Sequence, residues 1–386
     1  MSGETLERNV LGVVRFNTEP ASPVLDDGYP SVSVHATETT DGGFAELWTS
    51  ELPTEAGRQG SVSYAHDGEY LFAACRIPEM ADYTAASEST YTEALRLAEG
   101  LGYPHVFRIW HYISRLNDEN ASGLEVYREF CVGRARALER FAIGRDMPAA
   151  TVIGSRSGGI VIYFLANRSG HRRNLDNPRQ VRPFHYPSTY GPRSPNFARA
   201  TYLTQGTGVE RIFVSGTASI LGHRTTNVGD VEGQCRLSLD NVAHLVGAQN
   251  LAAHGISPGS SLSDLRSVKV YVRHQSDIAR VQQVCREMLS PSADVVYVNA
   301  DVCRADLLVE LEGIVVRSHA IEPDDATARN DRWNFGELPG PTASAPTTER
   351  VTASAEVDAQ PSSDEGGPYQ SRLDGGPAAE LVDRAL

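Results

Sequence analysis

The sequence contains no apolar run that approaches the roughly 20 residues needed by a membrane-spanning helix. Its first residues, MSGETLERNVLG, lack the basic region and following apolar stretch of a secretory signal peptide. Both absences favour a cytoplasmic protein without a membrane partner.

Cysteine is scarce and irregularly spaced. The chain has five cysteines, an odd number, and no two of them form a Cys-x-x-Cys pair. This pattern argues against a disulfide framework and a structural zinc site, and it is typical of reduced thiols in a cytoplasm. We therefore expect no bound metal. The cysteines are Cys75, Cys131, Cys235, Cys285 and Cys303.

A basic stripe is also missing. The formal net charge is −14, but residues 322–386 hold 13 acidic and 5 basic residues, so the first 321 residues account for only −6. The first 321 residues, which we expect to contain the folded part of the chain, are therefore only mildly acidic. We do not expect nucleic acid as a partner.

What is present divides the chain into four parts. Residues 1–166 alternate strand-like and helical patterns and are expected to form an N-terminal α+β lobe. Residues 167–199 are irregular and rich in arginine and tyrosine, and residues 200–320 have the pattern of a second α+β lobe. Residues 321–386 are acidic and rich in proline, alanine and serine, a composition that buries too little apolar surface to fold, so we expect a disordered tail.

The two lobes follow one order of elements. The second reads as strand pair, helix, strand, helix and strand pair, and the first as hairpin, helix, strand, helix and hairpin. The last hairpin of the first lobe is expected to join residues 151–154 and 160–166, and Ser276 is expected to cap a helix over 277–289. The simplest interpretation is an α+β chain of two tandem units with mixed sheets packed on helices.

Residues 295–316, VVYVNADVCRADLLVELEGIVV, read as strand, turn and strand. The second strand is apolar almost throughout, so both of its faces should be covered. Glu310 and Glu312 nevertheless lie in it and share one face. A buried carboxylate without partners costs several kcal/mol, so a buried acid seven residues after the thiol of Cys303 and near the cation of Arg304 is a candidate active site. The alternative is an edge strand whose glutamates lie in water.

Arginines and tyrosines supply candidate anchors for an anionic ligand. Tyr127 and Arg134 are seven residues apart on a helix over 124–141, so they project from one face, about 10 Å apart. Tyr186 and Arg199, in the irregular segment, could close over the same ligand. The alternative places Tyr127 in the core and Arg134 on the surface. Arg193 and Tyr190 are second candidates within the segment.

The second lobe resembles the YjgF-like family of small α+β proteins. The resemblance depends on FVSGTASI (213–220), VEGQCRLSLDNV (231–242), VKVYV (268–272) and LLVELEGI (307–314). In that family the ligand binds near the glutamate of the last strand, and Glu310 falls at that position. The arginine that such proteins carry about fifteen residues upstream is replaced here by residues 295–297.

The body from about residue 8 to 318 resembles the chorismatases, which act on chorismate in secondary metabolism with release of pyruvate. The pieces are FRIWHYI (107–113), GLEVYREFCVGRARAL (123–138), YPSTYGPRSPNFARA (186–200), FVSGTAS (213–219) and CRADLLVELEG (303–313). Their order and spacing make the resemblance specific. It implies that Tyr127, Arg134, Tyr186 and Arg199 bind the substrate.

The same resemblance implies a role for three further residues. Glu310 is the expected acid/base on the enolpyruvyl ether, because burial raises the pKa of a carboxyl and keeps a proton available near neutrality. Glycine and cysteine at two pocket positions mark chorismatases that form 3-hydroxybenzoate, whereas those that hydrolyse chorismate have alanine and an aliphatic residue. Gly216 and Cys303 match the first type: the glycine makes room beside the substrate ring, and the thiol of Cys303 is a second expected catalytic group, a soft acid/base. The alternative for Cys303 is a small buried hydrophobe.

These observations predict a chorismatase that converts chorismate to 3-hydroxybenzoate and pyruvate without a cofactor. Two alternatives remain for the reaction: hydrolysis to a dihydroxycyclohexadiene carboxylate, and imine or enamine deamination by a YjgF-like enzyme. A non-catalytic small-molecule binder is a third interpretation. Because two tandem units can supply contacts that YjgF-like proteins obtain by forming trimers, we expect a monomer.

Overall fold

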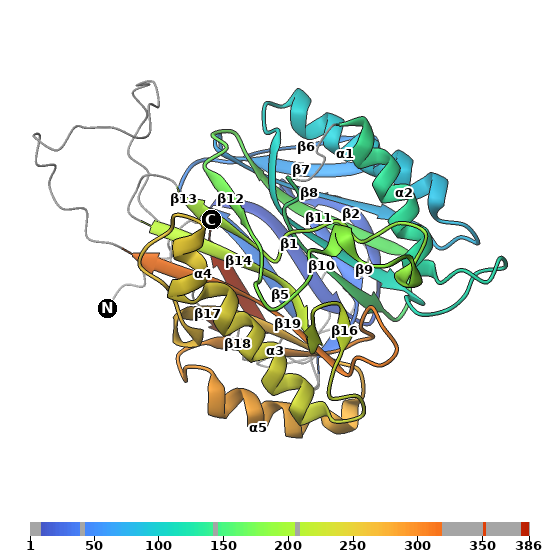
Figure 1. Cartoon of the computed structure of the whole chain (residues 1–386). Coiled ribbons are helices and arrows are strands. Elements are labelled where there is room, and N and C mark those ends of the chain that lie inside the picture. The colour runs from blue at the N-terminus through green and yellow to red at the C-terminus, as the bar shows by residue number, and fades with distance from the viewer. Residues whose placement is uncertain are drawn as a thin grey trace, which may run out of the picture.

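Three large β-sheets, a two-stranded sheet formed by β15 and β16, and five α-helices make up the fold of the described residues (Figure 1). The computed structural model describes residues 9–38, 43–141, 146–204, 209–318, 350–352 and 380–385. Most of the expected disordered tail lies outside the described residues; its two described strands, β20 and β21, continue the sheet formed by the N-terminus. Among the described residues, no helix is long and apolar enough to cross a membrane.

The N-terminal sheet has the strand order β2-β3-β1-β5-β21-β20. Strand β1 pairs in parallel with β3 and antiparallel with β5, and β21 pairs in parallel with β5. The strands are β1 (Asn9–Asn17), β2 (Ala21–Asp26), β3 (Tyr29–His35), β5 (Phe44–Ser50), β20 (Arg350–Thr352) and β21 (Glu380–Ala385).

The first-lobe sheet has the order β10-β9-β11-β8-β7-β6, and helices α1 and α2 cover one of its faces. Helix α1 buries Ala94, Leu95, Leu97 and Ala98 on the side facing the sheet, as the apolar spacing predicts. The elements are β6 (Glu55–Gln59), β7 (Val62–His66), β8 (Tyr70–Ile77), α1 (Thr84–Gly100), β9 (His105–Ser114), α2 (Val126–Arg140), β10 (Ala149–Ser155) and β11 (Ile160–Asn167).

The second-lobe sheet has the order β12-β13-β14-β19-β17-β18-β4 and packs on α3, α4 and α5. Helix α3 begins at Asp230, whose side chain accepts a hydrogen bond from the backbone N–H of Gly233. The elements are β4 (Thr37–Glu38), β12 (Arg172–Leu175), β13 (Ala200–Thr204), β14 (Val209–Ala218), β15 (Ile220–Leu221), β16 (Arg224–Thr225), α3 (Val231–Val246), α4 (Ala248–Ala253), β17 (Leu265–Val272), α5 (Ile278–Met288), β18 (Asp294–Asn299) and β19 (Val309–Ser318).

The two lobes share one topology, which confirms the predicted tandem α+β architecture. The order β7-β8-β11-β9-β10 in the first lobe matches β13-β14-β19-β17-β18 in the second. In both, the last two strands of the order are parallel to each other, and the central strand is antiparallel to both neighbours.

Three local predictions were wrong. Strands β10 and β11 do not form a hairpin, because β9 lies between them, and β17 likewise separates β18 from β19. The segment that joins β10 to β11 (residues 156–159) and the segment that joins β18 to β19 (residues 300–308) therefore each cross one strand of the sheet. Ser276 does not cap α5: it lies in a 3₁₀ turn, Gln275–Asp277, directly before the helix.

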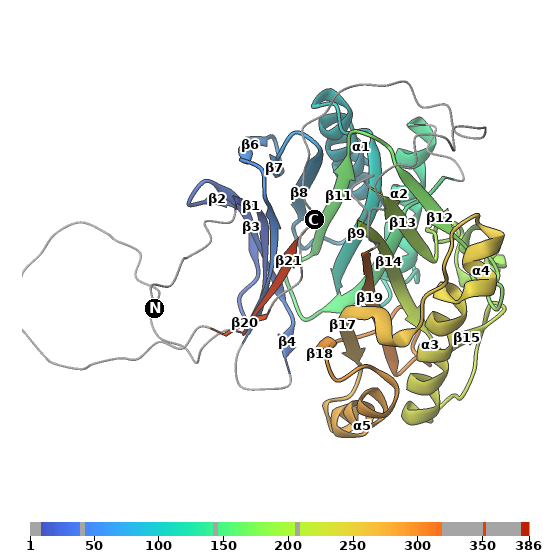
Figure 2. The ribbon, with the colours of Figure 1, turned by 90° about the vertical axis from the view of Figure 1, so that its left-hand side faces the viewer.

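The molecule is layered, with one apolar core between each pair of layers. Figure 2 shows the N-terminal sheet at one side, the lobe sheets in the middle and α3, α4 and α5 at the other side. A central core contains side chains from all three sheets, among them Trp48, Trp110 and Tyr271. Each lobe sheet has a second core on its other face, against its own helices. Strand β19 is therefore buried on both faces, as its apolar sequence predicted.

Candidate active site

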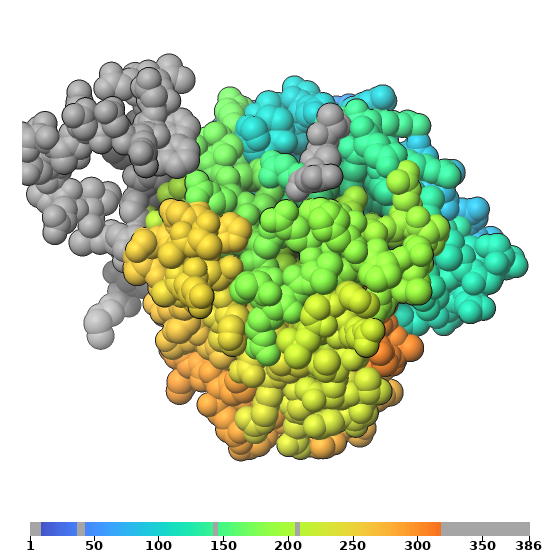
Figure 3. All heavy atoms as spheres, in the orientation of Figure 1, coloured from blue at the N-terminus to red at the C-terminus, as the bar shows by residue number. Residues whose placement is uncertain are grey.

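A cavity of about 630 Å³ lies where the two lobes meet. The first lobe contributes side chains from β9, α2 and β10, and the second from β14, β19 and the loop before β19. The segment 167–199 adds Tyr186 and Arg199, and in the space-filling view it occupies the middle of the face between the helices of the two lobes (Figure 3). All seven residues selected from the sequence line this cavity: Tyr127, Arg134, Tyr186, Arg199, Gly216, Cys303 and Glu310.

Glu310 enters the cavity from β19 and is only 4% exposed. Burial is the main reason that its pKa rises to about 8, and the nearby charge of Glu312 raises it further, although Arg199 and Arg108 act in the opposite direction. At neutral pH the carboxyl therefore keeps its proton. A carboxylic acid in this state can protonate a bound substrate.

Cys303 lies in the loop before β19, and its Sγ is 4.0 Å from Oε2 of Glu310. Burial and the neighbouring Glu310 raise the pKa of the thiol to about 12. The sulfur is therefore a thiol rather than a thiolate at neutral pH. A raised pKa disfavours the thiolate, which is the nucleophilic form of cysteine, and leaves a neutral S–H that can donate a weak hydrogen bond.

Gly216 lies in β14 directly against the acid. A Cβ atom at this position would be 2.0 Å from Oε1 of Glu310, closer than non-bonded atoms approach. The absence of a side chain therefore allows Glu310 its observed place. The sequence predicted that this glycine makes room for the substrate ring; in the structure, the space that it leaves is occupied by the carboxyl of Glu310.

Arg134 is held by a chain of hydrogen bonds through the first lobe. The Nδ1–H of His111 donates to the carbonyl of Thr151 (2.7 Å), and Nε2 of His111 accepts from the hydroxyl of Tyr91. That hydroxyl accepts from Nε of Arg134 (3.0 Å), and Nη1 of Arg134 donates to the carbonyl of Asn196 (2.7 Å). Burial, with Arg134 nearby, lowers the pKa of His111 well below its usual value, so the ring is neutral.

Arg199 is fixed on the opposite side by Nη2, which donates to the hydroxyl of Tyr186 (2.8 Å) and to the carbonyl of Val181 (2.9 Å). Nε of Arg199 and Nη2 of Arg134 are buried and have no hydrogen-bond partner within the described part of the chain. Both arginine side chains line the cavity, and their guanidinium groups supply cationic donors to it. Such donors match the carboxylates of an anionic ligand.

Tyr127 and Arg134 both line the cavity from α2, in agreement with their predicted common face. Burial, with Cys131 nearby, raises the pKa of Tyr127 well above its ordinary value, so its hydroxyl is neutral. Of the second candidates, Tyr190 lines the cavity, whereas Arg193 does not and instead pairs with Glu139 (2.8 Å).

Arg304, the cation next to Cys303 in the sequence of the candidate site, also lines the cavity. Its guanidinium lies 4.0 Å from the ring centroid of Tyr190, and Nη1 donates to the carbonyl of His223 (2.9 Å). Its position directly after Cys303 was the available signal. Arg128 and Arg224 also line the cavity, so five arginines of the described chain favour an anionic ligand there.

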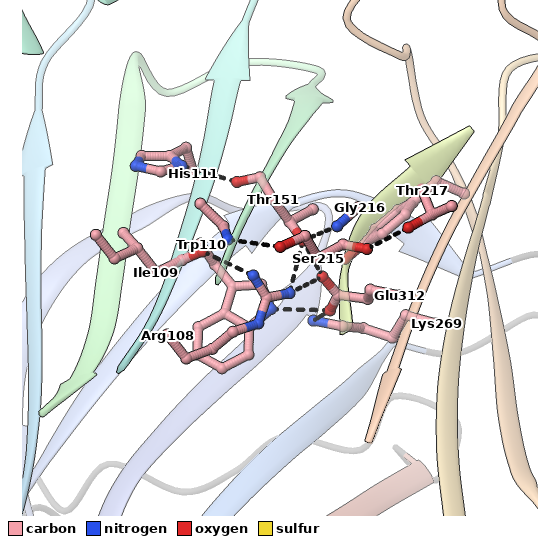
Figure 4. A network of polar contacts seen from close by, with 12 residues as sticks. Arg108, Ile109, Trp110, His111, Thr151, Ser215, Gly216, Thr217, Lys269 and Glu312 are labelled. Carbon is pink, nitrogen blue, oxygen red and sulfur yellow. Dashed lines mark hydrogen bonds and ion pairs between the residues drawn. The ribbon is translucent and has the colours of Figure 1, made fainter. Parts of the chain in front are cut away.

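Glu312 is not among the residues that line the cavity and belongs to a buried ion network (Figure 4). Nη2 of Arg108 lies 2.5 Å from its Oε2, and Nζ of Lys269 lies 2.8 Å from its Oε1. Lys269 also pairs with Glu46 of the N-terminal sheet (2.7 Å). Burial would raise the pKa of Glu312, but Lys269 and Arg108 outweigh it and lower the pKa to about 2.

Comparisons with known proteins agree with this architecture. Residues 46–166 match the family model described as chorismatase FkbO/Hyg5-like, N-terminal. The 3-hydroxybenzoate synthase of Streptomyces hygroscopicus is 50% identical over 314 residues, which are 80% of this chain and 92% of that protein. The chain belongs to the chorismatase family.

Two further chorismatases are similar over comparable lengths. A chorismatase of Streptomyces rapamycinicus is 46% identical over 80% of this chain and 93% of its own length. A crystal structure of a chorismatase superposes with a TM-score of 0.78 at 46% identity, covering 81% of this chain and 95% of that one. The family resemblance inferred from the sequence motifs is thereby confirmed.

Proposed function

We propose that this protein converts chorismate to 3-hydroxybenzoate and pyruvate, and that Glu310 supplies the proton that begins the reaction. The observation that carries the proposal is the presence of a buried, protonated carboxyl and the guanidinium groups of Arg134 and Arg199 around one cavity. Chorismate has two carboxylates and an enol ether. The arrangement offers an anchor for each carboxylate and an acid for the ether.

The first step is proton transfer from Glu310 to the methylene carbon of the enolpyruvyl group. The double-bond electrons form the new C–H bond, and the positive charge is shared between the former enol carbon and the ether oxygen. The carboxylate left on Glu310 lies near the cations of Arg199 and Arg108, which favour its charged form. These cations therefore stabilise the charge that the acid acquires.

The second step decides the product. Attack by the hydroxyl group of the substrate ring, release of pyruvate and aromatisation give 3-hydroxybenzoate; the atoms of chorismate equal those of the two products, so no water is consumed. Hydrolysis consumes one water and leaves a diol acid. Gly216 favours the route to 3-hydroxybenzoate because it allows Glu310 to lie close to strand β14. Cys303, beside Glu310, offers a protonated thiol at the place where water would enter.

The purified full chain, incubated with chorismate, tests the proposal. Pyruvate is followed with lactate dehydrogenase and NADH, and the aromatic product is identified by chromatography against 3-hydroxybenzoate, 4-hydroxybenzoate and the diol acid. We expect pyruvate and 3-hydroxybenzoate in equal amounts. Absence of pyruvate would overturn the function, whereas a diol acid would overturn only the assignment of the second step.

Glu310→Gln should lower kcat at least a thousandfold with the fold retained, because the amide cannot donate the proton. The control is Glu129→Gln on α2: this glutamate is also buried, and burial also raises its pKa, but it lies outside the cavity. The control should keep kcat within a few fold. Near-normal turnover of Glu310→Gln would remove the carboxyl from the acid role.

We also propose that one chain forms the complete site without a second copy. Every residue lining the cavity lies between His111 and Glu310 of the same chain, and both lobes contribute. Turnover per chain should then be independent of protein concentration. Light scattering combined with activity across a hundredfold dilution measures both properties.

A further inference from the structure

The part of β14 that faces Glu310 is out of register with β19, although the N–H of Ser215 still donates to the carbonyl of Arg199 beside β13 (3.0 Å). Pairing between β14 and β19 shifts register between Val214 and Thr217, so Ser215 and Gly216 lie in an irregular stretch of the ladder. On the side where the pairing with β19 is interrupted, strand β10 of the first lobe adds two hydrogen bonds to this stretch. The N–H of Ala150 donates to Oγ of Ser215 (3.0 Å), and the N–H of Gly216 donates to Oγ1 of Thr151 (2.9 Å).

The hydroxyl of Thr151 has no spare hydrogen-bonding capacity. It donates to Oε2 of Glu312 and accepts from Nη2 of Arg108 (2.6 Å) and from the N–H of Gly216 (Figure 4). A hydroxyl has one donor and two acceptor sites, so each is used once. Thr151 is 2% exposed, and the charged residues on either side of the hydroxyl fix its rotamer.

The contact between Gly216 and Glu310 leaves no clearance. The space that a Cβ at residue 216 would need is already occupied by Oε1 of Glu310, and the next nearest group is the methyl Cγ2 of Thr151 at 3.3 Å. A small displacement of the Gly216 backbone would therefore move the carboxyl or open a gap beside it. Water entering that gap would reach the same substrate carbon as the ring hydroxyl.

We propose that Thr151 is a positioning residue that, through its hydrogen bond to Gly216, holds the Glu310 carboxyl where proton transfer and the water-free route both succeed. The inference rests on the proposed function. It assigns Thr151 no contact with the reacting atoms. Its effect passes from the hydroxyl to the Gly216 backbone and from there to the acid.

Thr151→Val tests the hydroxyl, because valine keeps the shape and the buried volume of threonine. We expect kcat to fall about tenfold or more, since a buried N–H is left without its partner and β14 relaxes. KM should stay within about threefold, because Arg134 and Arg199 are unchanged. The share of diol acid among the products should rise several-fold.

Thr201→Val is a matched control. Thr201 on β13 is equally buried, its Oγ1 accepts from the N–H of Ala149 (2.8 Å) and donates to Asn174 (2.8 Å), and it lies outside the cavity. It should lower thermal stability to a similar degree and leave kcat and the product ratio within twofold of the unaltered protein. Equal losses of kcat in both variants would show a structural role only and overturn the proposal.

Thr151→Ser retains the hydroxyl and removes the methyl group. If the valine variant does not fold, the serine variant shows which of the two groups is needed for activity. We expect kcat and product ratio within threefold of the unaltered protein. A loss of tenfold or more in Thr151→Ser would assign the effect to methyl packing and overturn the proposal. A chain that is inactive without any substitution would instead contradict the proposed function, so the two failures are distinct.

Discussion

Glu310 and Glu312 are two residues apart on one strand, yet at neutral pH one is protonated and the other ionised. Both are buried, so burial alone would raise both pKa values. Lys269 and Arg108 contact Glu312 directly, whereas the charges that act on Glu310 are more distant. The different partners, rather than different depths, determine which carboxyl carries a proton.

The pKa of Glu310 predicts a loss of activity at high pH. Because the protonated carboxyl is the reactive form, kcat should be highest below the pKa and fall tenfold per pH unit well above about 8. A profile of kcat between pH 6 and 9.5 measures it. Constant kcat across this range would contradict the acid role.

The raised pKa of Glu310 also makes the free energy of unfolding depend on pH. The folded state binds the proton more tightly than the unfolded chain, so the free energy of unfolding should fall as pH rises between about 4.5 and 8. Glu310→Gln has no proton to lose and should remove this part of the slope. Denaturant unfolding of both proteins at several pH values tests the prediction independently of turnover. Parallel slopes would show that Glu310 does not titrate in this window.

Cys303→Ala should shift the products towards the diol acid. The sulfur lies 4.0 Å from the carboxyl of Glu310, and alanine would leave room for water there. We expect the ratio of diol acid to 3-hydroxybenzoate to rise at least fivefold, measured by chromatography. Cys75→Ala, at a buried cysteine in the first lobe outside the cavity, is the control. An unchanged ratio in Cys303→Ala would count against product selection by the thiol.

At the scale of elements, one lysine connects all three sheets. Lys269 on β17 is fully buried and lies between Glu46 on β5 and Glu312 on β19, and the hydroxyls of Tyr112 and Tyr163 from the first lobe complete its surroundings. Charges in a core are tolerated only when paired in this way. The network fixes how the N-terminal sheet and both lobes pack together.

Lys269→Met should therefore destabilise the protein by about 3–5 kcal/mol, because two buried carboxylates would lose their shared cation. Equilibrium denaturation in urea measures the loss. Arg280→Met on α5, which removes an exposed ion pair with Glu232, should leave stability nearly unchanged. A similar stability for both variants would mean that Glu312 and Glu46 find other partners or protonate without cost.

The sequence predicted the positions of the helices and strands better than it predicted which strands lie next to each other in a sheet. The helices and most strands follow from local periodicity, and the seven cavity residues were placed by motif and by position on a helix or strand. The pairing of β10 with β9 instead of β11 could not be read locally, because both arrangements bury the same apolar residues. The roles of Thr151 and Lys269 were not predicted for a related reason. Thr151 binds a residue more than 60 positions away and Lys269 a residue more than 40 positions away, so no local sequence pattern marks either of them.

At the scale of the whole molecule, the duplication is asymmetric. The hydroxyls of Tyr112 on β9 and Tyr271 on β17, two equivalent strands, meet at 2.8 Å. Opposite Tyr271 in the ladder stands Glu310, and opposite Tyr112 stands Val161. The first lobe thus has an aliphatic residue where the second has the acid.

Removal of residues 319–386 should leave kcat/KM within about twofold. All residues lining the cavity precede residue 311, and the described strands of this region pair with β5 at the side of the N-terminal sheet rather than with the lobe strands. Pyruvate release by the shortened and the full chain provides the measurement. A tenfold loss would show that the C-terminal region contributes to the site.

The cavity lies between the two lobes, so the residues that line it can be varied in two separate parts of the gene. The residues of α2 that line the cavity and the strand that carries Glu310 are encoded more than 150 codons apart, in two lobes that share one strand order. Variation limited to α2 can therefore alter which ring acid is accepted without touching the proton donor. Substrate choice and reaction type can be engineered in separate halves of one gene.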